Sequence, residues 1–137
     1  MSWTNINIKE INPAQLDLVA PGTYVFAINT GAKYNERGAI LASANIESDG
    51  EFRGKKMLFS YPDPESLSQD GKLQTWSSVA FKRLEVALGE DVQEGEDPVQ
   101  YLNRIAGAKF AAGVTVKEDN TGTKRSNISL LNVKPAA

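Results

Sequence analysis

The chain has 137 residues and a formal net charge of −2, and 41% of its residues are hydrophobic. This length fits a single domain, and the apolar fraction is sufficient for a core. Cysteine and histidine are both absent, which excludes disulfides, thiolate nucleophiles, a Ser-His triad and the commonest metal ligand. We therefore expect no enzymatic activity, no cofactor and no metal.

The first residues differ in pattern from the rest of the chain. Apolar alternation over residues 1–20 is weak and rests on Ile6 and Ile8. We predict an N-terminal arm or an additional strand over 1–20, followed by a single domain over 21–134. Trp3 in this arm has no predicted packing partner, and a contact to another subunit is one interpretation of it.

Three segments of the domain alternate with a period of two, which is typical of strands. In the first segment the alternation places Tyr24, Phe26 and Ile28 on one face. Pro62 ends the third segment, because proline cannot donate to a sheet ladder. The predicted strands cover 23–29, 39–46 and 55–61, with turns over 31–38 and around Gly50.

After these strands, apolar residues recur every three or four positions, which indicates helices. A first helix is predicted over 76–88, with Gly89 as its C-terminal cap. Asp97 as N-cap and Pro98 at the first helical position predict a second, short helix.

The connection between the two helices is strongly acidic. Residues 85–100 hold six Asp or Glu side chains and no basic one. The rest of the chain then carries 15 basic against 11 acidic residues (17 minus these six). A basic face and an acidic face can therefore coexist on one molecule. The acidic spacing does not match a calcium loop, which favours a solvated segment over a metal site.

Two further strands are predicted over 110–116 and 126–133, with a turn over 118–122. Three strands, a helical insert and two strands is the connectivity of the OB-fold. We predict a mainly β fold, an OB-fold-like five-stranded β-barrel with a helical insert, into which Trp76 packs as a plug. An α+β sandwich is the alternative that this order of elements leaves open.

Spaced glycines and apolar residues in this chain also form two blocks that resemble a known family. The blocks are Pro21-Gly-Thr-Tyr24, Gly38 and Phe52-Arg-Gly54 in the first half, and Ala87-Leu-Gly89, Leu102, Gly107 and Phe110 in the second. Together, over roughly residues 20–133, they resemble small phage-encoded single-stranded DNA-binding proteins of replication and recombination. The resemblance implies single-stranded DNA or RNA as ligand, bound without regard to sequence. It also implies assembly into homo-oligomers and contacts with replication or recombination proteins.

The resemblance and the general behaviour of OB-folds place the ligand on the second and third strands and on the neighbouring loops. Cations there would neutralise phosphates, and aromatic rings would stack on bases. The candidate residues are Lys33, Tyr34, Arg37, Phe52, Arg53, Lys55, Lys56, Tyr61, Lys117, Lys124 and Arg125.

Each candidate also has a purely structural interpretation. Tyr34 and Phe52 are aromatic residues in polar loops, yet either ring can fold back onto the barrel. Tyr61 is a stacking platform only if the end of its strand is exposed, and core packing is the default for its face. Lys117 and Arg125 can pair with neighbouring acidic residues, an interaction of small energy.

Two other function classes fit the composition. A structural or protein-interaction subunit, such as a virion or assembly component, needs no nucleic acid, and the mild net acidity agrees with it. A magnesium-dependent nuclease needs converging carboxylates, for which the sequence gives little support. The chain has no apolar stretch of the roughly 20 residues that cross a bilayer, and we expect a cytoplasmic protein, in the host cytoplasm if phage-encoded.

Overall fold

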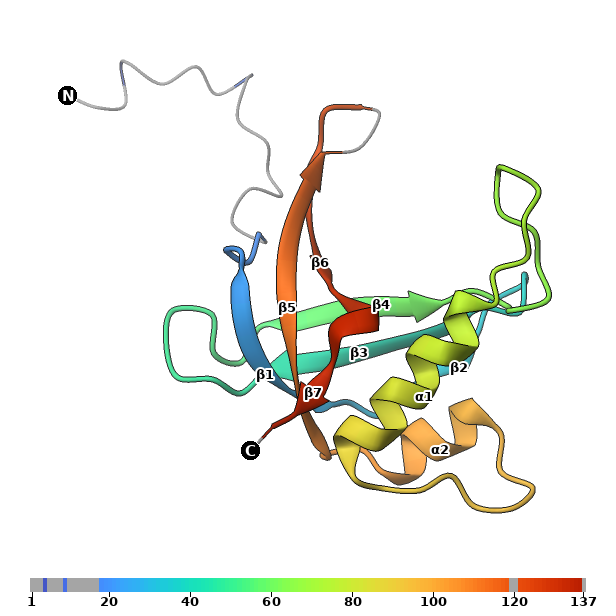
Figure 1. Cartoon of the computed structure of the whole chain (residues 1–137). Helices are drawn as coiled ribbons and strands as arrows, with labels where there is room; N and C mark the ends of the chain where they lie inside the picture. The colour runs from blue at the N-terminus through green and yellow to red at the C-terminus, as the bar shows by residue number, and fades with distance from the viewer. Residues whose placement is uncertain (1–3, 5–8, 10–17, 119–120, 137) are drawn as a thin grey trace.

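The computed structural model describes residues 4, 9, 18–118 and 121–136. Most of the predicted N-terminal arm, including Trp3, lies outside the described residues. Residues 18–20 are described and lead directly into the first strand (Figure 1).

The strands form one antiparallel sheet that curls into a half-barrel (Figure 1). Its five main strands lie in the spatial order β4-β3-β1-β5-β6, with β2 added beside β3 and β7 beside β5. This is the predicted mainly β, OB-like architecture, with the helices inserted between β4 and β5. The strands are β1 (Gly22–Ile28), β2 (Lys33–Tyr34), β3 (Ile40–Ile46), β4 (Lys56–Tyr61), β5 (Lys109–Glu118), β6 (Lys124–Ile128) and β7 (Lys134–Pro135).

The segment before β1 lies at the seam between β4 and β6. No ladder joins these two strands within the described residues. Val19 is fully buried there as part of the core. Its backbone N–H donates to Ser126 Oγ at 2.6 Å, and the same hydroxyl donates back to the Val19 carbonyl at 3.0 Å. The predicted arm therefore ends in a segment that is anchored on β6 and helps to close the half-barrel.

The core follows from the alternation of β3 and β4. Both strands bury every second side chain, as predicted, because neighbouring residues point to opposite faces of a sheet, and β3 buries Ser43 on its other face as well. Phe26 of β1 stacks on Phe110 of β5, with ring centroids 5.4 Å apart, and joins the two halves of the sheet. The inward faces consist of Ile40, Ala42, Ala44 and Ile46 on β3 and Met57, Phe59 and Tyr61 on β4.

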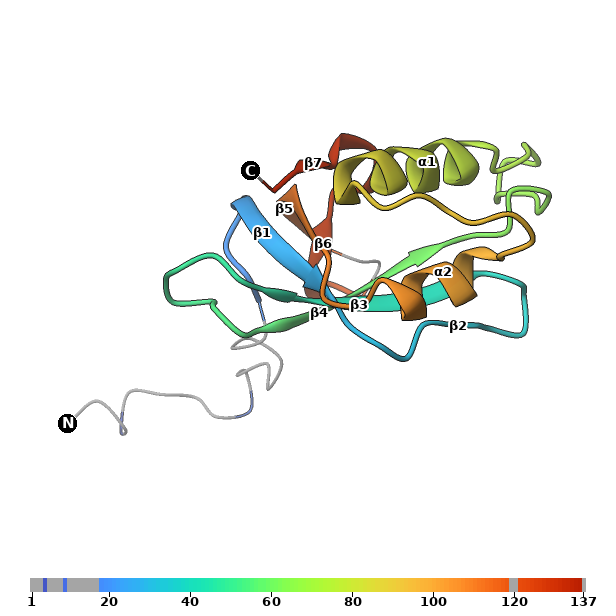
Figure 2. The same ribbon diagram turned by 90° about the horizontal axis from the view of Figure 1, so that it is seen from below.

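Two helices cover the ends of the curled sheet, α1 (Trp76–Leu88) and α2 (Pro98–Arg104). Figure 2 shows α1 beside β5 and β7, and α2 near β2. Gly89 ends α1 with φ of +71°, a left-handed conformation that favours glycine. None of the described helices is long and apolar enough to span a bilayer.

The predicted role of Trp76 as the plug of the barrel is wrong. Trp76 is 40% exposed, and Ala80 and Leu84, which are fully buried, face the core instead. Ala80 and Leu84 are four residues apart and so share one face of α1. Trp76, four residues before Ala80, lies near the same face, but it is the first residue of the helix and its side chain stays partly exposed.

The C-terminal strand is shorter than predicted. Instead of a strand over 126–133, β6 ends at Ile128, and a 3₁₀ turn (Leu130–Asn132) follows. The backbone N–H of Ser129 donates to the Gly113 carbonyl at 2.8 Å, and Arg83 Nη1 of α1 donates to the Leu131 carbonyl at 2.7 Å. These tertiary hydrogen bonds accompany the turn, and the apolar alternation of the segment does not reveal them.

Candidate nucleic-acid interface

The outward-facing side chains of β3 and β4 form the floor of the candidate interface. They are the residues between the core positions, and the ladder register sets them in rows across the strands. β2 extends the first row, because it pairs with the start of β3. The rows are Lys33–Leu41–Ser60, Ser43–Leu58 and Asn45–Lys56.

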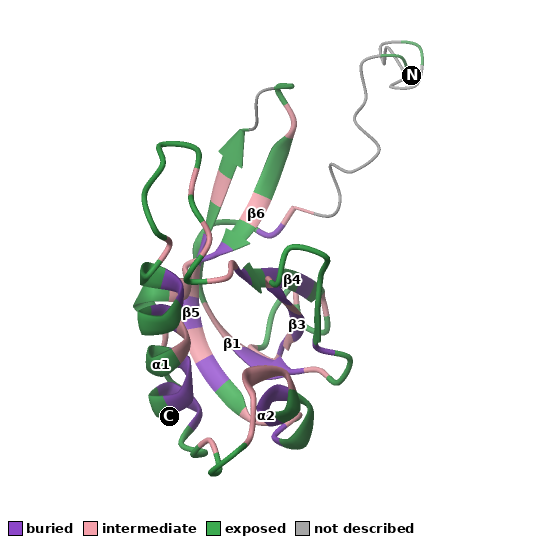
Figure 3. Cartoon of the chain, turned by 90° about the vertical axis from the view of Figure 1, so that its right-hand side faces the viewer, coloured by how far each residue is buried: buried purple, intermediate pink, exposed green. Residues whose placement is uncertain are grey.

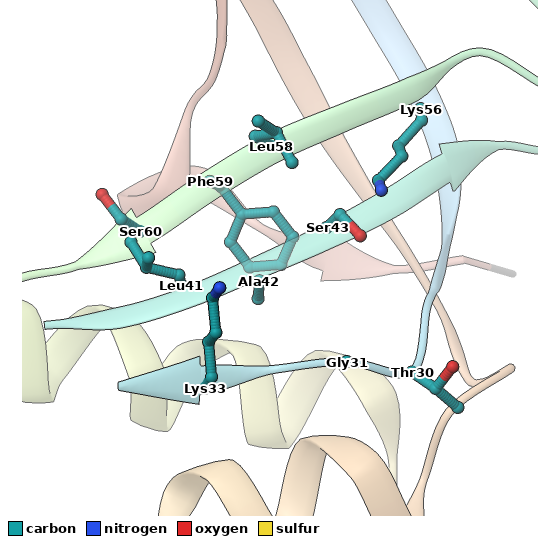
Figure 4. Close-up of a pocket in the computed structure, with 10 residues that line it drawn as sticks. All are labelled: Thr30, Gly31, Lys33, Leu41, Ala42, Ser43, Lys56, Leu58, Phe59 and Ser60. Atoms are coloured by element: carbon teal, nitrogen blue, oxygen red, sulfur yellow. The ribbon is translucent and has the colours of Figure 1, made fainter. Parts of the chain in front are cut away.

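Three open hollows lie over this face and join into one surface. The central hollow, of about 590 Å³, lies over β2, β3 and β4 (Figure 4). A hollow of about 450 Å³ follows residues 33–37, and another of about 470 Å³ lies between β4 and β6. The central hollow shares Lys33 and Leu41 with the former and Lys56 and Leu58 with the latter. We call this continuous surface, defined by the residues that line the three hollows, the basic groove.

The charge of the groove is predominantly positive. Its lining residues include five basic side chains and one acidic side chain, Glu36. Lys33 and Lys56 extend toward each other from β2 and β4 across β3 (Figure 4). Two further cations of the groove lie on the β5–β6 hairpin, which is exposed toward its tip (Figure 3). The five basic residues are Lys33, Arg37, Lys56, Lys124 and Arg125.

Apolar and aromatic surface lies between these cations. Tyr34 is 46% exposed and Leu58 is 75% exposed. Phosphates need cations, whereas unstacked bases need aromatic or apolar surface. The groove offers both kinds of contact side by side.

A side chain of α2 holds the β2 segment in position. Asn103 Oδ1 accepts hydrogen bonds from the backbone N–H groups of Gly31 at 2.8 Å and Ala32 at 3.0 Å. Its Nδ2 donates to the Ala32 carbonyl at 3.1 Å. Three hydrogen bonds from one amide thus fix the residues that immediately precede Lys33 and Tyr34.

Tyr34 is also held from α2. Its hydroxyl lies 3.5 Å from Oδ1 of Asp97, which caps α2 by accepting from the backbone N–H groups of Val99 and Gln100. Partial burial, followed by the Asp97 charge, raises the pKa of the Tyr34 hydroxyl. The Tyr34 side chain is therefore an uncharged phenol where it lines the groove.

Most of the predicted cations lie on strands rather than in loops. Lys33, Lys56, Lys117 and the pair Lys124–Arg125 all have strand partners in the ladder, and their side chains are exposed. The sequence pattern placed all of them except Lys56, the second residue of the predicted strand over 55–61, in loops, because charged residues interrupt the apolar alternation there. A solvent-facing position on a strand accepts a cation equally well.

Some predicted residues lie away from the groove. Phe52, Arg53 and Lys55 belong to the β3–β4 turn and do not line the three hollows. The Phe52 ring packs edge-on against Tyr24, with centroids 6.2 Å apart, and Arg53 Nη1 lies 2.6 Å from an Asp49 carboxylate oxygen. Lys117 pairs with Arg125 across the β5–β6 ladder but does not line the groove either.

Tyr61 is not an exposed stacking platform. It is only 1% exposed and packs against Phe59 and Phe81 with ring centroids 5.9 and 5.4 Å away. The alternation of β4 points it into the core together with Met57 and Phe59. Burial raises the pKa of its hydroxyl far above the usual value.

Several carboxylates of the acidic segment are engaged in ion pairs and hydrogen bonds. Glu96 binds Arg104 through two hydrogen bonds, at 2.7 and 2.9 Å, and Glu85 pairs with Lys82 and accepts from the backbone N–H of Val92. These contacts lower the pKa of both carboxyls, chiefly through Arg104 for Glu96 and through Lys82 for Glu85. The described part of the chain holds no cluster of three metal-ligating side chains.

Sequence reasoning left out the polar and apolar floor of the groove. Leu58 lines it, and Asn29 Nδ2 donates to Ser43 Oγ at 3.2 Å and to Asn45 Oδ1 at 3.0 Å beside it. The signal was present, since the period of two assigns Leu41, Ser43, Asn45 and Leu58 to the outward face. Only their lack of charge kept them from the list of candidates.

Comparison with known proteins gives no family for this chain. No protein-family model matches it, and no curated protein matches it in sequence.

Proposed function

We propose that the protein binds single-stranded DNA along the basic groove without reading its sequence there, and performs no catalytic step. One observation carries this proposal: three hollows share lining residues and present five cations, Tyr34 and Leu58 on one continuous surface. The OB-like fold is often used for oligonucleotides on this same face. The role proposed for it is the coating of single strands during phage-type replication or recombination, in the host cytoplasm.

Two kinds of contact would contribute to binding. The ammonium and guanidinium groups would neutralise phosphates and release counterions, which supplies affinity independent of sequence. Bases would stack on Tyr34 and lie against Leu58, and each stacked base contributes about 1–3 kcal/mol. A duplex keeps its bases paired and stacked inside, so it would gain only the phosphate contacts.

The direct test is fluorescence anisotropy of a labelled dT oligonucleotide at about 50 mM salt, with unlabelled duplex as competitor. Saturable binding that duplex displaces poorly is the expected result. Failure of the oligonucleotide to bind at this salt concentration would overturn the proposal.

A pair of lysine variants tests the location of the site. Lys56→Ala removes a cation that lines two of the three hollows, and we expect weaker binding. Lys72→Ala removes an equal charge from an exposed position in the segment between β4 and α1, outside the groove, and we expect little change. Equal effects of the two substitutions would contradict the site.

A second candidate function rests on the exposed side of α1. Trp76, Val79 and Val86 are 40%, 48% and 65% exposed and recur every three or seven residues along the helix. Such a stripe suits a structural subunit that assembles with further copies of itself. Sedimentation of the wild type and of a Val79→Glu, Val86→Glu variant distinguishes this function, since only assembly through α1 would be lost in the variant.

A further inference from the structure

A separate hollow of about 380 Å³ adjoins the basic groove at Tyr34. It lies between the loop after β2, the end of β4, the start of α1 and the start of α2. Its walls consist largely of rings, contributed by Tyr34, Phe81, Pro62, Pro64 and Pro98. Flat apolar walls of this kind suit a planar ring.

The hollow also has a fixed hydrogen-bond acceptor. Asp63 Oδ1 accepts from the backbone N–H of Glu65 at 2.9 Å, and the Asp63 carbonyl accepts from the backbone N–H of Ser66 at 2.9 Å. Asp63 Oδ2 has no hydrogen-bond partner among the described residues. The carboxylate is therefore held by its own turn and has one oxygen left for a ligand.

The loop that contains Gly38 lies close to this oxygen. Gly38 has φ of +79°, and a Cβ at this position would lie 3.2 Å from Asp63 Oδ2. A side chain here would be strained and would crowd the carboxylate. Ser77 and Ser78 add hydroxyls from the first turn of α1 to the same hollow.

The buried floor contains a further polar group. Tyr61 lines the hollow, and its hydroxyl has no hydrogen-bond partner within the described structure. Buried polar groups are satisfied in the great majority of cases. A hollow with ring walls, a free acceptor and an unsatisfied hydroxyl is suited to a ligand that is both planar and polar.

We infer that this hollow is a base pocket, which holds one unstacked nucleobase with an exocyclic amino group from a strand bound in the basic groove. The inference rests on the proposed function and extends it. Tyr34 lines both the groove and the pocket, so a base can leave the groove without a break in the path of the strand. An amino group donates to the free Asp63 oxygen, as cytosine N4 does to carboxylates in base recognition. Thymine and uracil present a carbonyl at that position and would oppose the carboxylate.

The test compares two oligonucleotides of matched ring size, dC12 and dU12, at pH 7.5 and about 50 mM salt. The wild type should bind dC12 about five- to tenfold more tightly. In Asp63→Asn the amide oxygen can keep the turn, whereas the amide nitrogen replaces the free acceptor with a donor. This variant should lose the preference or reverse it.

Two further variants complete the design. Glu65→Gln makes the same change of charge in the same loop, at an exposed residue that does not line the pocket, and should keep the wild-type ratio. Ser78→Leu, at an exposed helical position, should fill the mouth and bring the ratio to about one, with less than a twofold change for dU12. Circular dichroism of each variant verifies that it is folded.

The outcomes separate the base pocket from the groove. Equal binding of both oligonucleotides by the wild type, or an unchanged ratio in Asp63→Asn, would overturn the base pocket while the groove stands. The pocket would then be assigned to another occupant, such as a cationic side chain of a partner protein. If neither oligonucleotide binds, the proposed function itself is overturned.

Discussion

At the scale of single residues, the two aromatic candidates from polar segments have different surroundings. Tyr34 lines the basic groove and is 46% exposed, whereas Phe52 packs against Tyr24 at the β3–β4 turn. The sequence assigned them equivalent roles because both are rings next to cations. Only a tertiary contact, the packing of Phe52 against Tyr24, distinguishes the surroundings of the two residues.

Tyr34→Ala should therefore weaken binding of a dT oligonucleotide by about 1–3 kcal/mol, since it removes a stacking surface. Phe52→Ala is the matched control and should leave the affinity within about twofold of the wild type. Anisotropy titrations of both variants measure the difference. Similar losses in the two would show that stacking does not depend on the groove.

Tyr61 gives a prediction about stability. Its hydroxyl is buried with no hydrogen-bond partner among the described residues, and an unsatisfied buried polar group costs about 1–3 kcal/mol. Tyr61→Phe removes the hydroxyl and keeps the ring contacts with Phe59 and Phe81. We expect the free energy of unfolding in urea to rise, by about 1 kcal/mol. A clear loss of stability would mean that the hydroxyl has a partner in solution.

At the scale of elements, α2 acts as a support for the groove. Asn103→Ala removes the three hydrogen bonds that hold residues 31 and 32 in front of β2. Loss of partners for these backbone groups should lower the free energy of unfolding by about 1–3 kcal/mol. Binding of single strands should weaken as well, although Asn103 does not line the groove. Asn103→Asp keeps the acceptor and should retain more of both properties, as unfolding and anisotropy measurements on the two variants would show.

The acidic connection before α2 should make stability depend on pH in acid. Arg104, and then the backbone N–H of Gln93, lower the pKa of Glu96 below its ordinary 4.5. A carboxyl with a lowered pKa in the folded state stabilises the fold above the unfolded pKa, and this contribution is lost as the pH falls through the folded pKa. The free energy of unfolding should thus decrease below about pH 4.5, and less so in Glu96→Gln. Urea unfolding at pH 7, 5 and 3.5 measures the decrease, and equal decreases in both proteins would contradict the role of Glu96.

Most elements could be predicted from the sequence because local periodicity determines them. The alternation of β3 and β4 and the cap at Gly89 are properties of a few adjacent residues. The 3₁₀ turn after β6 and the exposure of Trp76 depend on contacts with distant segments. The period of a single segment contains no information about such contacts.

The candidate site was predicted in part, for the same reason. Its cations are recognisable as residue types, but their grouping depends on which strands are neighbours. Lys56 and Lys124 are far apart in sequence and line one hollow only because β4 and β6 meet at the seam. Arg53, only three residues before Lys56, points to a different contact with Asp49.

At the scale of the whole molecule, the uneven distribution of charge makes a net negative charge compatible with the proposed binding of an anionic ligand. The groove gathers five cations, while Glu85 and Glu96 are engaged with Lys82 and Arg104 at the helices. A net charge of −2 therefore does not describe the surface that a strand would meet.

The most direct test of this account is the salt dependence of single-strand binding. Each phosphate neutralised on a single strand contributes about −0.7 to the slope of log K against log salt. Occupation of all five groove cations predicts a slope of about −3.5, and a Lys33→Ala, Lys56→Ala, Lys124→Ala variant should show about −1.4. A slope near zero, or an equal slope in the triple variant, would contradict the basic groove as the binding surface.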